Sequence, residues 1–279
     1  MYARAPSISS ESVVMNQKSS IELLIQRDRL WITLGLVSAM VLAWVYLLRE
    51  SAAMDAMAAE ARRHAAMGMA GMTMRAWDAA DWLGLFAMWA VMMVGMMLPS
   101  AAPVIMLVLG AYRLRGDSNA HLAAVAFIGG YAIVWTTFSA FAALAQLELH
   151  RTALLSDDMR LHSVAVSGML LVIAGVYQWL PVKNRCLVHC QAPLAFLTQR
   201  WRPGVGGGFS MGASHGAFCV GCCWLLMTLL FVLGVMNLFW IAVLAAIVLL
   251  EKLTRHGLLA GRLVGLAAVA WGAYLIVFG

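Results

Sequence analysis

The stretch GFSMGASHGAFCVGCCWLLMTLLFVL occupies residues 208–233 and contains no Asp, Glu, Lys or Arg. A helix needs an apolar run of about 20 residues to cross the hydrocarbon core of a bilayer. This stretch is long enough to do so, and it holds three of the five cysteines of the chain. It therefore predicts a membrane-spanning helix that carries reactive side chains.

The composition of the whole chain agrees with this prediction. Apolar residues make up 63% of the 279 residues and charged residues only 11%, whereas globular domains have roughly 45–50% and roughly 25%. So apolar a chain cannot cover a soluble surface, which excludes a water-soluble enzyme and an intrinsically disordered protein. We expect an all-α, polytopic helix bundle surrounded by the lipid bilayer.

Further apolar runs raise the expected number of transmembrane helices to about seven. The predicted spans are residues 30–48, 83–110, 122–147, 163–181, 208–233, 237–251 and 258–278. The sixth run is short for a bilayer, so the membrane must thin locally or the bundle must shield its ends.

The segments before and after the first span suggest a division of the chain. The residues that precede it carry charges of both signs and are long for a cleaved leader, which favours a retained signal anchor. We expect a cytoplasmic tail at 1–29, the signal-anchor helix at 30–48, a Met-rich outer loop at 49–82, and a six-helix metal-binding membrane domain at 83–279.

The basic residues indicate the orientation. The segments on the side of the N-terminus hold about two thirds of the 19 Lys and Arg residues, and cytoplasmic loops are the ones enriched in these residues. This predicts an N-in, C-out protein of the bacterial inner membrane. The net charge of +6 needs no nucleic-acid partner, because the basic residues do not cluster with stacking aromatic residues.

The fifth predicted span carries the strongest functional motif. Four soft side chains at positions i, i+4, i+7 and i+8 share one helix face: His215, Cys219, Cys222 and Cys223. Imidazole and thiolate together suit Cu(I), with Zn(II) as the alternative. The other interpretation is that these cysteines pack as small apolar residues, which explains one cysteine better than three beside a histidine.

A second cluster, with Cys186, His189 and Cys190, lies in the predicted cytoplasmic loop between the fourth and fifth spans. It offers up to three ligands, one fewer than a tetrahedral site needs. Free thiols in a reducing compartment are an equally good interpretation. Because the fifth span begins on the side of this loop, the two clusters can converge into one site.

Methionine supplies a third feature, since the chain has 20 Met residues. Those of the second span repeat at helical spacing, as packing residues also do. The outer loop contains four in close succession: Met67, Met69, Met72 and Met74. Thioethers bind Cu(I) or Ag(I) in an oxidising space where thiols form disulfides. The alternative is an amphipathic helix lying on the membrane surface.

Glu251 ends the sixth predicted span at a depth close to that of His215. It can hydrogen-bond the imidazole of His215 and fix its tautomer, as carboxylates often do behind metal ligands. An interfacial Glu251 beside a snorkelling Lys252 is the other interpretation.

Several motifs together resemble a bacterial family whose members are known only as predicted metal-binding integral membrane proteins of unknown function. They are MMLPSAAP (96–103), YQWLPVKNRCLVHC (177–190), HGAFCVGCCWLLMTLLFVLGVMNLFW (215–240) and EKL (251–253). The resemblance runs from about Trp77 to Gly279, leaving out the first helix. It implies metal binding by Cys186, Cys190, His215, Cys219, Cys222 and Cys223.

These patterns favour a soft-metal protein, with copper first, that transports the ion or delivers it to a membrane metalloenzyme or a periplasmic metal chaperone. Two alternatives stay open: a membrane thiol–disulfide oxidoreductase using Cys219 and Cys222, and a structural subunit whose helices are pinned by a metal. No catalytic triad, paired-carboxylate or di-iron pattern stands out, so we do not expect an enzyme.

Overall fold

The computed structural model describes residues 10–67, 79–152, 154–155 and 160–279. These residues form a helical bundle, which confirms the all-α prediction. The helices are α1 Ser10–Ala66, α2 Ala79–Leu114, α3 Ala120–Arg151, α4 Val164–Tyr177, α5 Pro181–Gln191, α6 Pro193–Arg200, α7 Gly204–Thr228, α8 Leu230–Leu233, α9 Leu238–Leu253 and α10 Gly257–Phe278.

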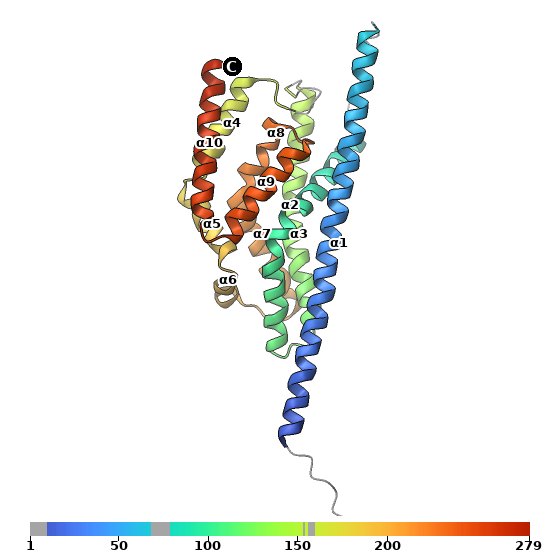
Figure 1. Ribbon diagram of the computed structural model, residues 1–279, viewed down its shortest axis with the longest axis vertical. Coiled ribbons are helices and arrows are strands. Elements are labelled where there is room, and N and C mark those ends of the chain that lie inside the picture. Colours follow the sequence, from blue (N-terminus) through green and yellow to red (C-terminus); the bar gives the residue numbers. More distant parts are fainter. Residues whose placement is uncertain (1–9, 68–78, 153, 156–159) are drawn as a thin grey trace, which may run out of the picture.

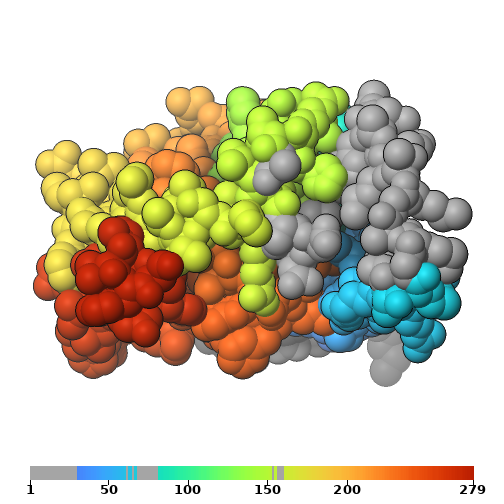
Figure 2. All heavy atoms as spheres, turned by 90° about the horizontal axis from the view of Figure 1, so that it is seen from above, coloured from blue at the N-terminus to red at the C-terminus, as the bar shows by residue number. Residues whose placement is uncertain are grey.

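Most of the helices run along one long axis (Figure 1). The start of α1 lies at one end of this axis and the C-terminus of α10 at the other. Five helices are long and apolar enough to cross a membrane, and the pair α4 and α5 makes a sixth candidate that is bent by 62°. Seen along the axis, α1 and α10 lie on opposite sides of an elongated cross-section (Figure 2).

Two of the seven predicted spans, the fourth and the sixth, do not appear as single helices long enough to cross the membrane. The fourth span, 163–181, ends early because Pro181 cannot continue α4 and instead begins α5 at its first position. The sixth span is α9, whose 16 residues extend over only about 24 Å at about 1.5 Å per residue. The hydrocarbon core is about 30 Å thick, so α9 is too short to cross it unaided.

Helix α1 is longer than its predicted span at 30–48. It has 57 residues and continues to Ala66, so the first part of the predicted outer loop is helical. Met67 follows in a turn and is 61% exposed. Met69, Met72 and Met74 lie outside the described residues, and copper binding by the outer loop stays a prediction.

Helices α3 and α7 pack with their backbones in contact, and this pairing sets the position of α7. A Cβ atom at Gly208 or Gly212 of α7 would overlap the carbonyl oxygen of Ala123 or Phe127 on α3. Gly130 of α3 is equally close to the backbone of α7. Small residues allow such close approach between helices in a membrane, and they hold α7 firmly in the middle of the bundle.

Candidate metal centre

The soft side chains of α7 form one buried face, as their spacing predicts. Helix α7 begins at Gly204, whose φ of 72° suits glycine, and it continues without interruption through the motif. None of the four predicted ligands on it is more than 3% exposed: His215, Cys219, Cys222 and Cys223. The helix therefore presents three thiols and an imidazole to the interior of the bundle.

Helix α5 brings the second cysteine cluster to the same place. The thiol of Cys190 contacts those of Cys219 and Cys222. The sulfur of Cys186 lies against the outer side of α7, where a Cβ at Gly221 would be 2.9 Å from it. The two clusters, which are separated in the sequence by α6 and a turn, thus meet around α7.

The bend between α4 and α5 allows the cysteines of α5 to reach those of α7. Pro181 turns the chain after α4, and the hydroxyl of Tyr177, at the end of α4, donates to the backbone carbonyl of Gly221 on α7. Helix α5 is thereby directed along α7 with Cys190 facing the thiols.

The side chain of His189 interacts with groups outside the thiol cluster. Its ring stacks on Phe218 with the centroids 4.1 Å apart and the planes at 6°, and its Nδ1 lies 2.8 Å from the carbonyl oxygen of Arg185. The structure therefore does not bring His189 into the group of contacting thiols, although the sequence predicted it as a ligand.

The imidazole of His215, in contrast to that of His189, is buried in the interior of the bundle. Its ring lies among the aromatic rings of Phe127, Tyr131 and Phe196, with centroid distances of 5.9, 5.9 and 5.3 Å. Its buried Nδ1 has no hydrogen-bond partner among the described residues. Leaving a buried polar atom unpaired costs about 1–3 kcal/mol. A metal ion bound by this nitrogen would remove that cost.

The most unusual residue of the centre is Lys252, which no sequence motif identified as part of the site. Its ammonium is buried, with the residue only 5% exposed, and lies 2.9 Å from the sulfur of Cys219. It also lies 3.3 Å from the Ser100 hydroxyl and 3.8 Å from the Met97 sulfur. The interpretation of Lys252 as an interfacial, snorkelling residue is wrong, because α9 is short and its last turn packs inside the bundle.

Methionines of α2 line the centre from the other side. The sulfur of Met97 is 3.9 Å from that of Cys223, and Met92, Met93 and Met96 are all buried. Packing explains most of this stripe, as the sequence analysis allowed, but Met97 also adds a thioether beside the thiols.

Glu251 does not hydrogen-bond His215 as the sequence analysis suggested. Both of its carboxylate oxygens accept from Lys183 Nζ, at 2.8 and 2.7 Å, and Lys183 also donates to Gln178. The amide of Gln191 donates to the backbone carbonyl of Glu251 at 2.6 Å. A buried carboxylate needs a nearby cation, and the α5 lysine supplies one, so this pair joins α5 to α9.

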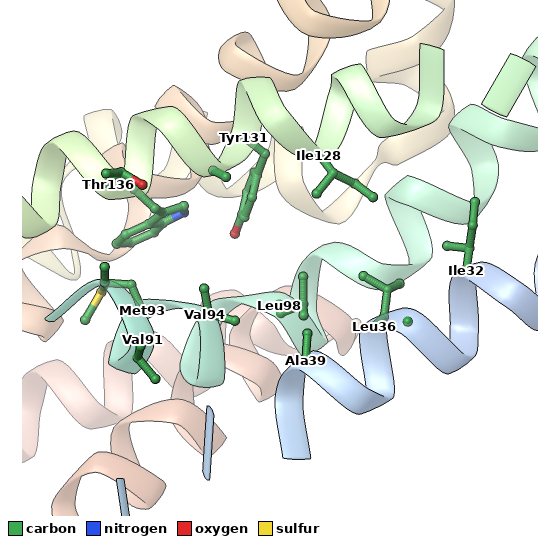
Figure 3. Close-up of a pocket in the computed structure, with 14 residues that line it drawn as sticks. Ile32, Leu36, Ala39, Val91, Met93, Val94, Leu98, Ile128, Tyr131 and Thr136 are labelled. Atoms are coloured by element: carbon green, nitrogen blue, oxygen red, sulfur yellow. The ribbon is translucent and has the colours of Figure 1, made fainter. Parts of the chain in front are cut away.

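The ring of Tyr131 separates the centre from an apolar cavity of about 490 Å³ between α1, α2 and α3. Figure 3 shows Tyr131 extending from α3 toward α2, with Met93 and Leu98 across from it and Leu36 on α1. The Tyr131 hydroxyl is 3.1 Å from the Cys219 sulfur. The phenol thus closes the centre on the side of α1.

In the structure, thiols of the centre make hydrogen bonds to other groups of the protein. All five cysteines are free, and the thiols of Cys222 and Cys223 donate to the Cys219 carbonyl at 3.1 and 2.9 Å. In the part of the chain that the structure describes, no three His, Cys, Asp or Glu residues have the arrangement of a finished metal site. Soft donor atoms are nevertheless concentrated here, and a bound metal would replace the hydrogen bonds that these thiols make.

A comparison with protein families agrees with this chemistry. A family model described as PpoB2, copper chaperone, matches residues 86–275. The matched segment contains all five cysteines, His215 and Lys252. No curated protein and no solved structure matches the chain.

Proposed function

This chain belongs to the PpoB2 copper chaperone family, and from that premise we propose that it is a Cu(I) chaperone of the bacterial inner membrane. The thiols around α7 hold the ion. A membrane metalloenzyme or a periplasmic metal-binding protein then receives it.

One observation carries this proposal: the α5 and α7 cysteines converge near the buried imidazole of His215. Cys190 contacts Cys219 and Cys222, and the buried Nδ1 of His215, one turn before Cys219, has no hydrogen-bond partner in the part of the chain that the structure describes. Thiolates and thioethers are soft ligands that suit Cu(I), and imidazole also binds copper. Cu(I) would bind through Cys190, Cys219 and Cys222, with His215 and Met97 as neighbouring donors.

The methionines of α2 supply a route to this centre. Met88, Met92 or Met93, and Met96 or Met97 follow one another turn by turn, and all five are buried. From Met88 to Met97 this stripe covers about 14 Å at about 1.5 Å per residue. Transfer between thioethers keeps the ion coordinated at every step. The segment with Met67, Met69, Met72 and Met74, which precedes α2, would capture copper first.

The proposal is tested by replacing Cys219 and Cys222 together with Ser. We expect the purified variant to lose most of its copper, measured by elemental analysis, and copper loading of a membrane copper enzyme to fall in parallel. Ser139→Ala/Ser167→Ala is the matched control, because it also alters two buried polar side chains. Full copper retention in the cysteine variant, with helix content unchanged, would contradict the proposal.

The contact of Cys190 with Cys219 and Cys222 would also permit disulfide exchange, which keeps the oxidoreductase alternative testable in the same experiment. An oxidoreductase would contain a disulfide and little copper after purification. A structural metal site would retain copper without loading any acceptor enzyme. Thiol counting and the metallation assay separate both from a chaperone.

A further inference from the structure

A polar pocket of about 230 Å³ lies beside the first turns of α7, and we refer to it as the arginine pocket. It is formed by the end of α6, the connection that follows α6 and one side of α7. Its polar lining consists of Gln199, Arg200, Arg202, Ser210 and Ser214. Among the described residues that line it there are two guanidinium groups and no carboxylate, so the pocket is electropositive.

The serines of α7 hold the two guanidinium groups in place. Arg200 Nη1 donates to Ser214 Oγ at 3.1 Å, and Arg202 Nη1 donates to Ser210 Oγ at 2.8 Å. A guanidinium has five N–H groups, so most of those on each arginine are left for a ligand. Each serine oxygen accepts here, and no acceptor for its proton lies among the described residues. The pocket thus offers hydrogen-bond donors from four side chains.

Neighbouring residues do not balance the charge of the arginine pocket. In the described part of the chain, neither Arg200 nor Arg202 forms an ion pair. Arg115 adds a third guanidinium, which stacks over the ring of Trp201 at 4.1 Å. The carboxylate of Asp117, in the turn after α2, accepts from the backbone of its own turn at 2.9 Å. A phosphate group offers the negative charge and the acceptor oxygens that such guanidinium groups bind.

The position of the pocket indicates the source of the phosphate. Helix α7 begins one of the candidate membrane spans, and the pocket lies beside its first turns, at the end of the bundle where α6 lies (Figure 1). Indole rings such as that of Trp201 are enriched where a membrane meets water. On the first two turns of α7, the apolar side chains of Val205 and Phe209 are exposed. A phospholipid would supply a phosphate for the pocket and acyl chains for these apolar side chains.

We propose that the arginine pocket binds the phosphate of an anionic phospholipid in the leaflet at this end of the bundle. Basic pockets between membrane helices bind lipid headgroups in this way. The proposal does not depend on the thiols or on their cargo. The bound phosphate would join Arg200 at the end of α6 to the serines of α7. It would thereby hold α6, whose Phe196 lies 5.3 Å from the His215 ring between centroids, against the helix that carries the thiols.

The test measures lipid binding by the full-length protein in detergent. Native mass spectrometry follows titrations with phosphatidylglycerol, which is anionic, and with phosphatidylcholine, whose choline cation balances its phosphate. The variant Arg200→Gln/Arg202→Gln keeps polar side chains and removes both charges. We expect the wild type to bind phosphatidylglycerol at least about tenfold more tightly than phosphatidylcholine, and the variant to lose this preference.

Arg255→Gln/Arg262→Gln is the matched control, because it removes two exposed arginines outside the pocket. It should keep the preference for phosphatidylglycerol. Equal affinity of the wild type for both lipids would overturn the proposal. The same loss in both double variants would also overturn it, since the lipid would then follow overall charge and not the pocket.

A second measurement uses only the wild type and so does not depend on the folding of a variant. Glycerol phosphate, which carries the phosphate without acyl chains, competes with phosphatidylglycerol for the protein. We expect it to displace the lipid only at concentrations at least about tenfold higher. Glycerol phosphate that binds as tightly as the lipid would overturn the proposal in favour of a site for soluble phosphate.

Discussion

At the scale of single residues, Cys190 and Cys186 make the most informative comparison. Both lie on α5, one helical turn apart, yet the Cys190 thiol contacts those of Cys219 and Cys222, while the Cys186 sulfur lies against the glycine at 221 on the other side of α7. The two residues have the same chemistry and the same neighbourhood in sequence, so their variants isolate the effect of position.

We predict that Cys190→Ser lowers Cu(I) affinity by at least about tenfold and Cys186→Ser by less than about threefold. The reason is that only Cys190 can share a metal ion with the α7 thiols. Chelator competition on the purified variants measures both values. Equal losses would show that both α5 cysteines bind the ion and that α5 must rotate to bring Cys186 inward.

The sequence identified the cysteines and His215 because helical spacing alone places them on one face. Lys252 and Glu251 could not be assigned in this way. A lysine at the end of an apolar run normally reaches the membrane surface. Only the packing of the short α9 shows that Lys252 points to Cys219 and that Glu251 belongs to Lys183.

At the scale of helices, the contact between α3 and α7 determines where the thiols lie. We predict that Gly212→Leu destabilises the protein by about 1–3 kcal/mol or prevents its folding, because the new side chain must push against the Phe127 carbonyl. The midpoint of thermal unfolding in detergent measures the effect.

Gly206→Leu is the matched control for this prediction. It changes the same residue type on the same helix, but no atom lies within 4 Å of a Cβ at Gly206. Its unfolding midpoint should stay near that of the wild type. A similar loss in both variants would mean that glycine matters through helix flexibility and not through close packing.

Most helices were predictable from their apolar runs, since length and hydropathy alone define them. The fourth span was predicted to continue to residue 181, and its division into α4 and α5 depends on how α5 packs against α7. In the structure Gly204 begins α7, and Gly208 contacts the backbone of α3. The contact of Gly208 could be predicted only from the position of the neighbouring helix.

At the scale of the whole molecule, the two ends of the chain lie at opposite ends of the long axis (Figure 1). Helix α6 and the C-terminal end of α2 lie toward the same end as the start of α1. This end carries Arg115, stacked over Trp201 at 4.1 Å, as well as Arg200 and Arg202. Positive charge near one end supports the N-in orientation.

We predict that alkaline phosphatase fused after Gly279 is active, because this reporter folds only where disulfides form, outside the cytoplasm. The same reporter inserted at Gly116, in the turn between α2 and α3, should be inactive. Phosphatase activity of intact cells measures both fusions. Activity at Gly116 and none at Gly279 would reverse the orientation and place the Met67 segment in the cytoplasm.

The backbone contact of α3 with α7 also limits how copper can enter or leave. At Gly208 and Gly212 no side chain separates the two helices, so we expect α7 with its thiols to stay in place during metal exchange. The opposite side of the cluster is α5, a short helix bounded by a bend and by Ala192. We therefore expect α5 to swing aside when copper exchanges, which makes Cys190 the last ligand to bind the arriving ion and the first to release it.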